Sequence, residues 1–134
     1  MKKHYHYLVV DDDSTSNLIC NFTIQRFDKE ARISLFRDPL EALNFIEETG
    51  FQDEICILFL DVNMPTLSGF EFLILFEKLP KEVREQYWIY MLTSSIEDFS
   101  SKAKEFTAVK DFLSKPLKLP YLEKIQQEVL AKMI

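Results

Sequence analysis

The fold is decided by the stretch ICILFLD, residues 55–61, in which six consecutive apolar residues are followed by an aspartate. A short apolar run without alternation is typical of a parallel strand that is buried on both faces of a sheet. Such strands occur where helices cover both faces. We therefore expect residues 55–60 to form the central strand of a sheet, with Asp61 at its carboxyl end.

Further short apolar segments alternate with amphipathic segments on both sides of this stretch. The pattern predicts strands over residues 7–10, 33–36, 88–92 and around 112–113, and helices over residues 15–28, 39–49, 70–79, 96–106 and from 120 onward. This alternation predicts an α/β domain of three layers with a parallel five-stranded sheet. It fits the doubly wound, flavodoxin-like (βα)5 sandwich with strand order 2-1-3-4-5. We expect residues 1–134 to form a single domain.

The spacing of apolar residues predicts which side of each helix is buried. The expected inward residues are Leu18, Ile19, Phe22 and Phe27 in the first helix, Leu40, Leu43 and Ile46 in the second, Ile96, Phe99, Ala103 and Phe106 in the fourth, and Leu122, Ile125, Val129 and Met133 in the last. The charged segment 81–87 lengthens the connection to the fourth strand, and its sequence suggests no role.

Composition excludes several classes of function. The formal net charge of −6, without a basic run, argues against binding to nucleic acid or to an anionic membrane surface. No apolar run approaches the ~18 residues that a membrane span requires. The two cysteines, Cys20 and Cys56, lie among apolar neighbours, which favours buried free thiols in a reducing compartment. We therefore expect a cytoplasmic protein. His4 and His6 suggest either a metal pair at alternate strand positions or a frayed N-terminus.

Polar residues follow the predicted strands at the edge where this topology opens a crevice. In the order 2-1-3-4-5, ligands bind outside the carboxyl ends of strands 1 and 3. Residues 11–13, all aspartates, end strand 1, and Asp61 ends strand 3, while Thr93 and Lys115 follow strands 4 and 5. Clustered carboxylates resist ionisation unless a cation compensates, and Mg²⁺ prefers oxygen ligands. A carboxylate beside Mg²⁺ can attack phosphorus and form an acyl phosphate.

Four segments at these strand ends resemble the receiver domains of two-component response regulators. They are LVVDD (8–12), LDVNMP (60–65) with Gly69 beyond it, MLTS (91–94) and FLSKP (112–116). The resemblance covers essentially the whole chain. It departs from the family pattern at Ala108-Val109, where the family commonly has a Gly-Ala pair.

The resemblance implies a phospho-acceptor. Asp61 would receive a phosphoryl group from a phosphohistidine on a sensor histidine kinase or a histidine phosphotransfer protein. Mg²⁺ would be bound by Asp12 and Asp61, by Asp11 through water, and by the backbone carbonyl of Asn63. The protein would not be a dedicated enzyme.

The resemblance also implies residues for phosphoryl binding and switching. Lys115 would pair with the phosphoryl oxygens, and the Lys115–Pro116 peptide bond would be cis. Thr93 and Phe112 would form a switch pair that moves together on phosphorylation. Ser94, the residue after Thr93, would belong to the same phosphoryl-binding and switch group.

Partners are implied by the same resemblance. A kinase would dock on the first helix, where Ile19, Phe22 and Ile24 offer apolar area. Phosphorylation would change the affinity for partner proteins of the face formed by the predicted helix over 96–106, the strand around 112–113 and the last helix. Because no output region follows the last helix, the expected output is a protein partner in trans, with the receiver a monomer or weak dimer.

Two other functions remain open at this point. Residues 10–15, VDDDST, also fit the Asp-x-Asp-x-Thr pattern of haloacid-dehalogenase-type phosphatases, with Asp11 as nucleophile and Asp13 as acid/base. That alternative leaves the segment around Asp61 unexplained, and the chain is short for such an enzyme. An interaction module of the same fold that is never phosphorylated is the second alternative.

Overall fold

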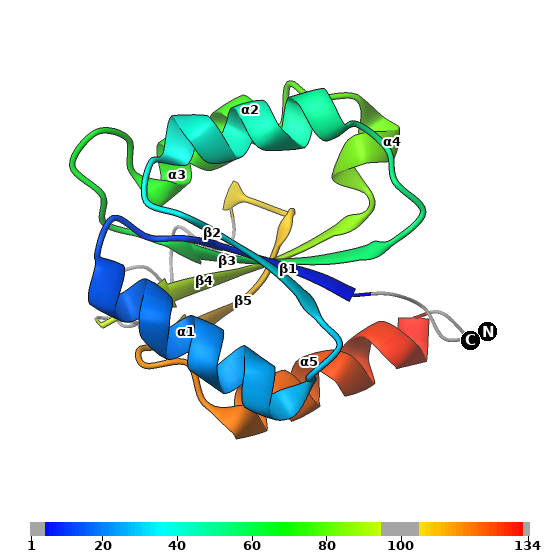
Figure 1. Ribbon diagram of the computed structural model, residues 1–134. Coiled ribbons are helices and arrows are strands. Elements are labelled where there is room, and N and C mark those ends of the chain that lie inside the picture. Colours follow the sequence, from blue (N-terminus) through cyan, green and yellow to red (C-terminus); the bar gives the residue numbers. More distant parts are fainter. Residues whose placement is uncertain (1–4, 95–104, 133–134) are drawn as a thin grey trace.

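A computed structural model describes residues 5–94 and 105–132 of the chain. Its centre is a parallel five-stranded sheet of order β2-β1-β3-β4-β5, as predicted (Figure 1). The strands are β1 (Tyr5–Val10), β2 (Arg32–Phe36), β3 (Ile55–Asp61), β4 (Tyr87–Thr93) and β5 (Val109–Ser114). The doubly wound α/β fold expected from the sequence is therefore confirmed.

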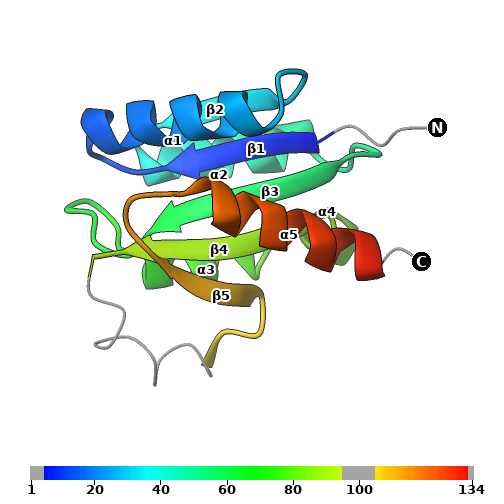
Figure 2. The ribbon, with the colours of Figure 1, turned by 90° about the horizontal axis from the view of Figure 1, so that it is seen from below.

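Helices cover both faces of the sheet. They are α1 (Ser14–Phe27), α2 (Pro39–Thr49), α3 (Gly69–Phe76), the single-turn α4 (Lys81–Arg84) and α5 (Leu119–Lys132). Helices α1 and α5 lie on one face, and α2, α3 and α4 lie on the other (Figures 1 and 2). The predicted helix over 96–106 lies largely outside the described residues. None of the helices within 5–94 and 105–132 is long and apolar enough to cross a membrane.

Local signals explain where the helices begin and end. The side chain of Asp38 accepts a hydrogen bond from the backbone N–H of Leu40 at 2.9 Å, and Pro39 occupies the first turn of α2. Gly50 ends α2 with a φ of 63°, which glycine adopts without strain. Helix α3 begins with a reciprocal capping box between Ser68 and Glu71.

The core has two halves that share the central strand. All seven residues of β3 are buried. Leu58 and Leu60 pack into the apolar cluster beneath α2 and α3, whereas Ile57 and Phe59 pack into the cluster beneath α1 and α5. This alternation is the reason for the uninterrupted apolar sequence, because both faces of the strand are covered.

The inward face predicted for α1 is wrong. Leu18, Ile19 and Phe22 are 57%, 41% and 67% exposed, and the buried residues are Asn17, Cys20 and Ile24. The inward side-chain amide of Asn17 donates a hydrogen bond to the backbone carbonyl of Asp11 at 2.9 Å, which satisfies that buried carbonyl. Phe27 does pack against the core as expected.

The other predicted faces are mostly confirmed. Leu43 and Ile46 of α2 are buried together with Pro39 and Ala42, but Leu40 is exposed because it lies beside this face. Helix α5 buries its predicted stripe, Leu122, Ile125 and Val129, while Met133 lies outside the described residues. Cys20 and Cys56 are free and buried, as expected.

The charged segment before β4 has a structural role that the sequence did not suggest. After the single turn of α4, the side chain of Gln86 donates to the carbonyl of Gly50 at 3.2 Å and accepts from the backbone N–H of Gln52 at 3.1 Å. These bonds join the end of α2 to the start of β4. His6 lies buried within β1, so fraying does not extend to it, and His4 lies outside the described residues.

Candidate functional site

Three carboxylates meet at the carboxyl edge of the central strands. Asp11 and Asp12 follow β1, and Asp61 is the last residue of β3. One carboxylate oxygen of each lies within 4.8 Å of those of the other two. Asp11 and Asp61 are buried, and Asp12 is half-buried. Register explains the convergence, since Val10 pairs with Leu60 in the adjacent strands and each is followed directly by an aspartate.

Lys115 extends into this acidic cluster from the loop after β5. Its Nζ lies 2.9 Å from Oδ2 of Asp11 and 3.2 Å from Oδ1 of Asp61. Its backbone N–H donates to the carbonyl of Thr93 at 2.9 Å, which holds the loop against the end of β4. The Lys115–Pro116 peptide bond is cis. One ammonium group thus stands between two carboxylates.

Backbone donors fix the two buried carboxylates. The N–H of Asp13 donates to Oδ1 of Asp11 at 2.9 Å, and the N–H of Asn63 donates to Oδ1 of Asp61 at 3.4 Å. Asn17, which the sequence analysis missed, anchors the backbone of Asp11 from α1. The only sequence signal for it was a polar residue at helical spacing from Cys20.

Gly69 is required by close packing beneath the cluster. A Cβ added there would lie 2.5 Å from the carbonyl oxygen of Asp61 and 2.6 Å from Cε of Met91. The backbone N–H of Gly69 also donates to the carbonyl of Val62 at 2.9 Å. The loop after β3 is therefore folded tightly against the end of that strand, and only glycine fits there.

The charges of the cluster shift the protonation of its members. Burial and the neighbouring charge of Asp11 raise the pKa of Asp61 to about 6, against the opposing effect of Lys115. Burial alone would lower the pKa of Lys115, but its hydrogen bond and ion pair with Asp11, together with Asp61, raise that pKa above its ordinary value. With a single ammonium for three carboxylates, the cluster retains a negative charge that a cation would neutralise.

Its donor set suits magnesium. The ligands available are carboxylate oxygens, which Mg²⁺ prefers, and neither histidine nor cysteine belongs to this acidic group. The oxygen positions are close enough together for a single small ion to contact more than one of them.

The remaining predicted residues lie around the cluster at different depths. Thr93 is buried at the end of β4, and Ser94 after it is exposed. Asn63 is also exposed. Asp13 is exposed and caps α1 by accepting from the N–H of Thr15 at 3.0 Å, and it does not belong to the carboxylate cluster.

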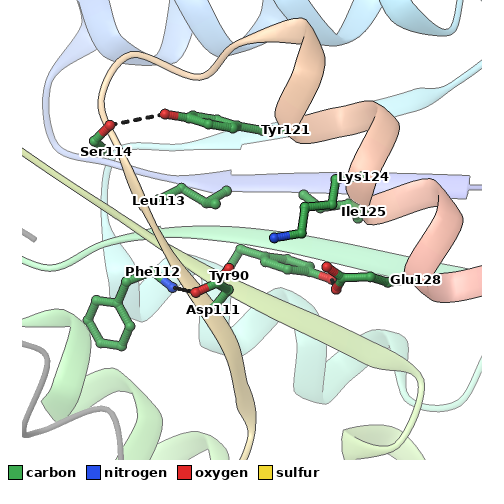
Figure 3. Close-up of a pocket in the computed structure, with 9 residues that line it drawn as sticks. All are labelled: Tyr90, Asp111, Phe112, Leu113, Ser114, Tyr121, Lys124, Ile125 and Glu128. Atoms are coloured by element: carbon green, nitrogen blue, oxygen red, sulfur yellow. Dashed lines mark hydrogen bonds between the residues drawn. The ribbon is translucent and has the colours of Figure 1, made fainter.

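Phe112 lies on β5, where it pairs with Met91, two residues before Thr93. Its ring lies on the α3 side of the strand, with a centroid 6.2 Å from that of Phe70 (Figure 3). It is half-buried. The ring therefore has room to change its degree of burial.

Two cavities adjoin these elements. One, of about 320 Å³, lies beside the acidic cluster, where Ile19, Cys20 and Leu117 supply apolar walls next to Asp11 and Lys115. The other, of about 290 Å³, lies between β5 and α5 (Figure 3). Its walls include Tyr90, Leu113, Ser114, Tyr121, Lys124 and Glu128.

Comparisons with known proteins agree with the fold described above. Residues 7–127 match the family of response regulator receiver domains. The chemotaxis protein CheY4 of Vibrio cholerae is 30% identical, with 94% of this chain and 98% of that chain covered and a TM-score of 0.68. A response regulator receiver protein from Dyadobacter fermentans has the same fold, with a TM-score of 0.86 at 21% identity over 92% of this chain and 96% of that one.

A longer protein is also similar. The cyclic di-GMP phosphodiesterase response regulator RpfG of Xanthomonas campestris is 28% identical over 83% of this chain. The matched segment spans only 28% of the length of that relative.

Proposed function

Because this chain belongs to the family of response regulator receiver domains, we propose that it accepts a phosphoryl group on the carboxylate of Asp61. Receiver domains of this family act in two-component signalling. The observation that supports the proposal is the position of Asp61 at the end of β3, with Oδ1 3.2 Å from Nζ of Lys115 and an oxygen within 4.8 Å of those of Asp11 and Asp12.

The transfer is an in-line displacement at phosphorus. A carboxylate oxygen of Asp61 forms the new P–O bond while the P–N bond of a phosphohistidine donor breaks, and the departing imidazole nitrogen keeps the electron pair and takes a proton from solvent. Because the pKa of Asp61 is about 6, the carboxylate is mainly ionised at neutral pH and can act as the nucleophile. Lys115 changes partner from the carboxylates to the phosphoryl oxygens.

Mg²⁺ would be held by Asp12 and Asp61, by Asp11 through water, and by the backbone carbonyl of Asn63. Once bound, it supplies positive charge for the oxygens of the transferring group. Asp11 serves a second purpose in this scheme, because its ion pair with Lys115 keeps the ammonium beside the acceptor.

The phosphorylated state is transmitted through Thr93 and Phe112. The hydroxyl of Thr93 moves toward the phosphoryl group, and the half-buried ring of Phe112 turns inward. The cavity between β5 and α5 lies directly behind this strand, so we propose that the β5–α5 face carries the change to a downstream protein.

Two surface features favour a phosphodonor docking on α1. Leu18, Ile19 and Phe22 form an exposed apolar patch, and the 320 Å³ cavity connects Ile19 with the acidic cluster. Ile24, which the sequence analysis placed on this surface, is wrong for it because its side chain is buried in the core. Replacing Phe22 by alanine is expected to slow transfer from a phosphodonor protein. Leu130→Ala, at an exposed apolar position on α5, is the matched control and should leave the rate unchanged. Equal slowing by both variants would rule out this docking surface.

The acceptor assignment is tested by labelling with acetyl phosphate and Mg²⁺, followed by mass measurement. Asp61→Asn should abolish the adduct, and Asp13→Asn should leave it intact because that side chain is exposed and outside the cluster. An adduct that persists in Asp61→Asn and disappears in Asp11→Asn would favour the phosphatase alternative.

Beryllofluoride, which mimics an acyl phosphate at Asp61, separates a switch from an inert module. Amide NMR should show Mg²⁺-dependent shifts near Asp61, Thr93 and Phe112, and as far as Tyr121 on the β5–α5 face. A protein that binds beryllofluoride without shifts beyond Asp61 would not be a switch. We expect no catalytic activity beyond turnover of its own phosphoryl group.

A further inference from the structure

A second group of metal-ligating side chains lies at the amino ends of the central strands, opposite the carboxylate cluster. His6 is in β1, Cys56 is in β3, and Glu54 immediately precedes β3. One ligand atom from each lies within 4.8 Å of the other two. Asp11 lies five positions after His6 along the extended strand, a distance of about 16 Å, so this group is separate from the phospho-acceptor cluster.

The sheet itself aligns the histidine and the cysteine. His6 and Cys56 are direct register partners on adjacent strands, so their side chains project from the same face. Nδ1 of His6 lies 3.6 Å from Oε1 of Glu54. Two of the three ligands are therefore fixed by adjacent strands, and Glu54 reaches them from the bend before β3.

The second nitrogen of the imidazole is already engaged. Nε2 of His6 lies 2.8 Å from Oγ of Ser34 on β2. With the proton on Nε2, the ring donates to Ser34 and leaves the lone pair of Nδ1 directed at the space shared with Glu54. A metal-bound histidine is held in this way by a hydrogen bond to its other nitrogen.

Burial and charge also suit an ion. His6 and Cys56 are 3% and 2% exposed, and the side chain of Glu54 is 11% exposed. One thiolate and one carboxylate would together neutralise a divalent cation. At present Glu54 is paired with Arg32 at 3.0 Å, but the side chain of Arg32 is 62% exposed and can turn into solvent.

We propose that His6, Glu54 and Cys56 bind one divalent transition-metal ion of the zinc type, at the edge of the sheet opposite the phospho-acceptor. Sulfur and nitrogen ligands select such ions over Mg²⁺, and thiolate sulfur, imidazole nitrogen and carboxylate oxygen are the donor types that Zn²⁺ takes in proteins. On binding, the thiol of Cys56 loses its proton to solvent and forms the metal–sulfur bond, with no change in oxidation state. The ion ties β1 to β3 at their amino ends.

Titration with Co²⁺ tests the site directly, because a cobalt–thiolate bond produces a near-ultraviolet charge-transfer band that oxygen ligands cannot give. The titration is done in excess Mg²⁺, which occupies the acidic cluster. We expect the band to saturate at one equivalent of Co²⁺ and to disappear when Zn²⁺ is added. A band that is absent at one equivalent overturns the proposal.

The two buried cysteines provide a matched pair of variants. Cys56→Ser should lose the band, whereas Cys20→Ser should keep it, with circular dichroism to verify that both fold. A band that survives in Cys56→Ser overturns the proposal.

Glu54 and Arg32 supply two further variants that do not disturb the core. Glu54→Gln should weaken Zn²⁺ binding by at least about tenfold. Arg32→Ala should strengthen it, because the guanidinium competes for the carboxylate of Glu54 and repels the cation. Unchanged affinity in Glu54→Gln overturns the three-ligand site.

Discussion

Replacing Asp61 by asparagine is expected to stabilise the protein in the absence of divalent cations by about 1–2 kcal/mol at pH 8. The pKa of this carboxyl rises from 3.8 to about 6 in the folded state, mainly through burial and the neighbouring Asp11. A shift of about 2 units at about 1.4 kcal/mol per unit sets a ceiling of roughly 3 kcal/mol on the effect. The expected stabilisation is smaller than this limit, because the variant loses the ion pair with Lys115 and because water at the open end of the strands screens the charges.

The sign follows from proton binding. Between pH 3.8 and about 6 the folded wild type holds a proton on Asp61 that the unfolded chain releases, so stability falls as pH rises through this window. The asparagine variant lacks this loss. The difference in the free energy of unfolding between the variant and the wild type should therefore be small at pH 4, grow toward pH 7, and stay constant above it.

Urea unfolding followed by circular dichroism at pH 4 and pH 8 measures the difference. Asp13→Asn is the control, because Asp13 is exposed at the same edge and asparagine is an equally good helix cap, so its effect should stay within about 0.5 kcal/mol. Excess Mg²⁺ should stabilise the wild type more than Asp61→Asn. A variant less stable than the wild type at pH 8, or an advantage equal at both pH values, would refute this reasoning.

Four other substitutions have expected outcomes that urea unfolding can check. Lys115→Ala should destabilise the protein by about 2 kcal/mol without divalent cations, because it leaves buried carboxylates unpaired. Mg²⁺ should restore part of this loss of stability. No loss at all would mean that the ion pairs contribute nothing to stability. Gly69→Ala should lower stability by about 1–3 kcal/mol, because its Cβ would overlap the carbonyl oxygen of Asp61; a neutral effect would contradict the close packing. Ile24→Ala should lower stability by about 2–5 kcal/mol and Phe22→Ala by less than about 0.5 kcal/mol, and the reverse order would mean that α1 is turned as its sequence first suggested.

The strand order and the meeting of the acidic segments were predictable for a simple reason. An uninterrupted apolar run such as residues 55–60 fits a strand covered on both sides, and parallel strands all end at one edge. Residues that directly follow neighbouring strands, such as Asp11 and Asp61, must then lie near each other. No side-chain detail is needed for this inference.

The face of α1 was not predictable from spacing alone. Its apolar residues occur on more than one side of the helix, and periodicity does not say which side meets the sheet. The outcome depends on the inward Asn17, whose amide binds the backbone of Asp11, a contact between elements that the sequence does not reveal. The role of Gln86 was hidden for the same reason, since its partners lie more than thirty positions away in the chain.

The position of the single tryptophan has a practical consequence. Trp88 lies at the start of β4, at the edge of the sheet away from Thr93, and Nζ of Lys110 on β5 lies 5.2 Å from the centre of its ring. A cation bound among the aspartates is therefore too remote to quench its emission by contact. The unlabelled protein carries an optical reporter for the pairing of the outermost strand with its neighbour, and a change in fluorescence on activation would register displacement of β5 itself.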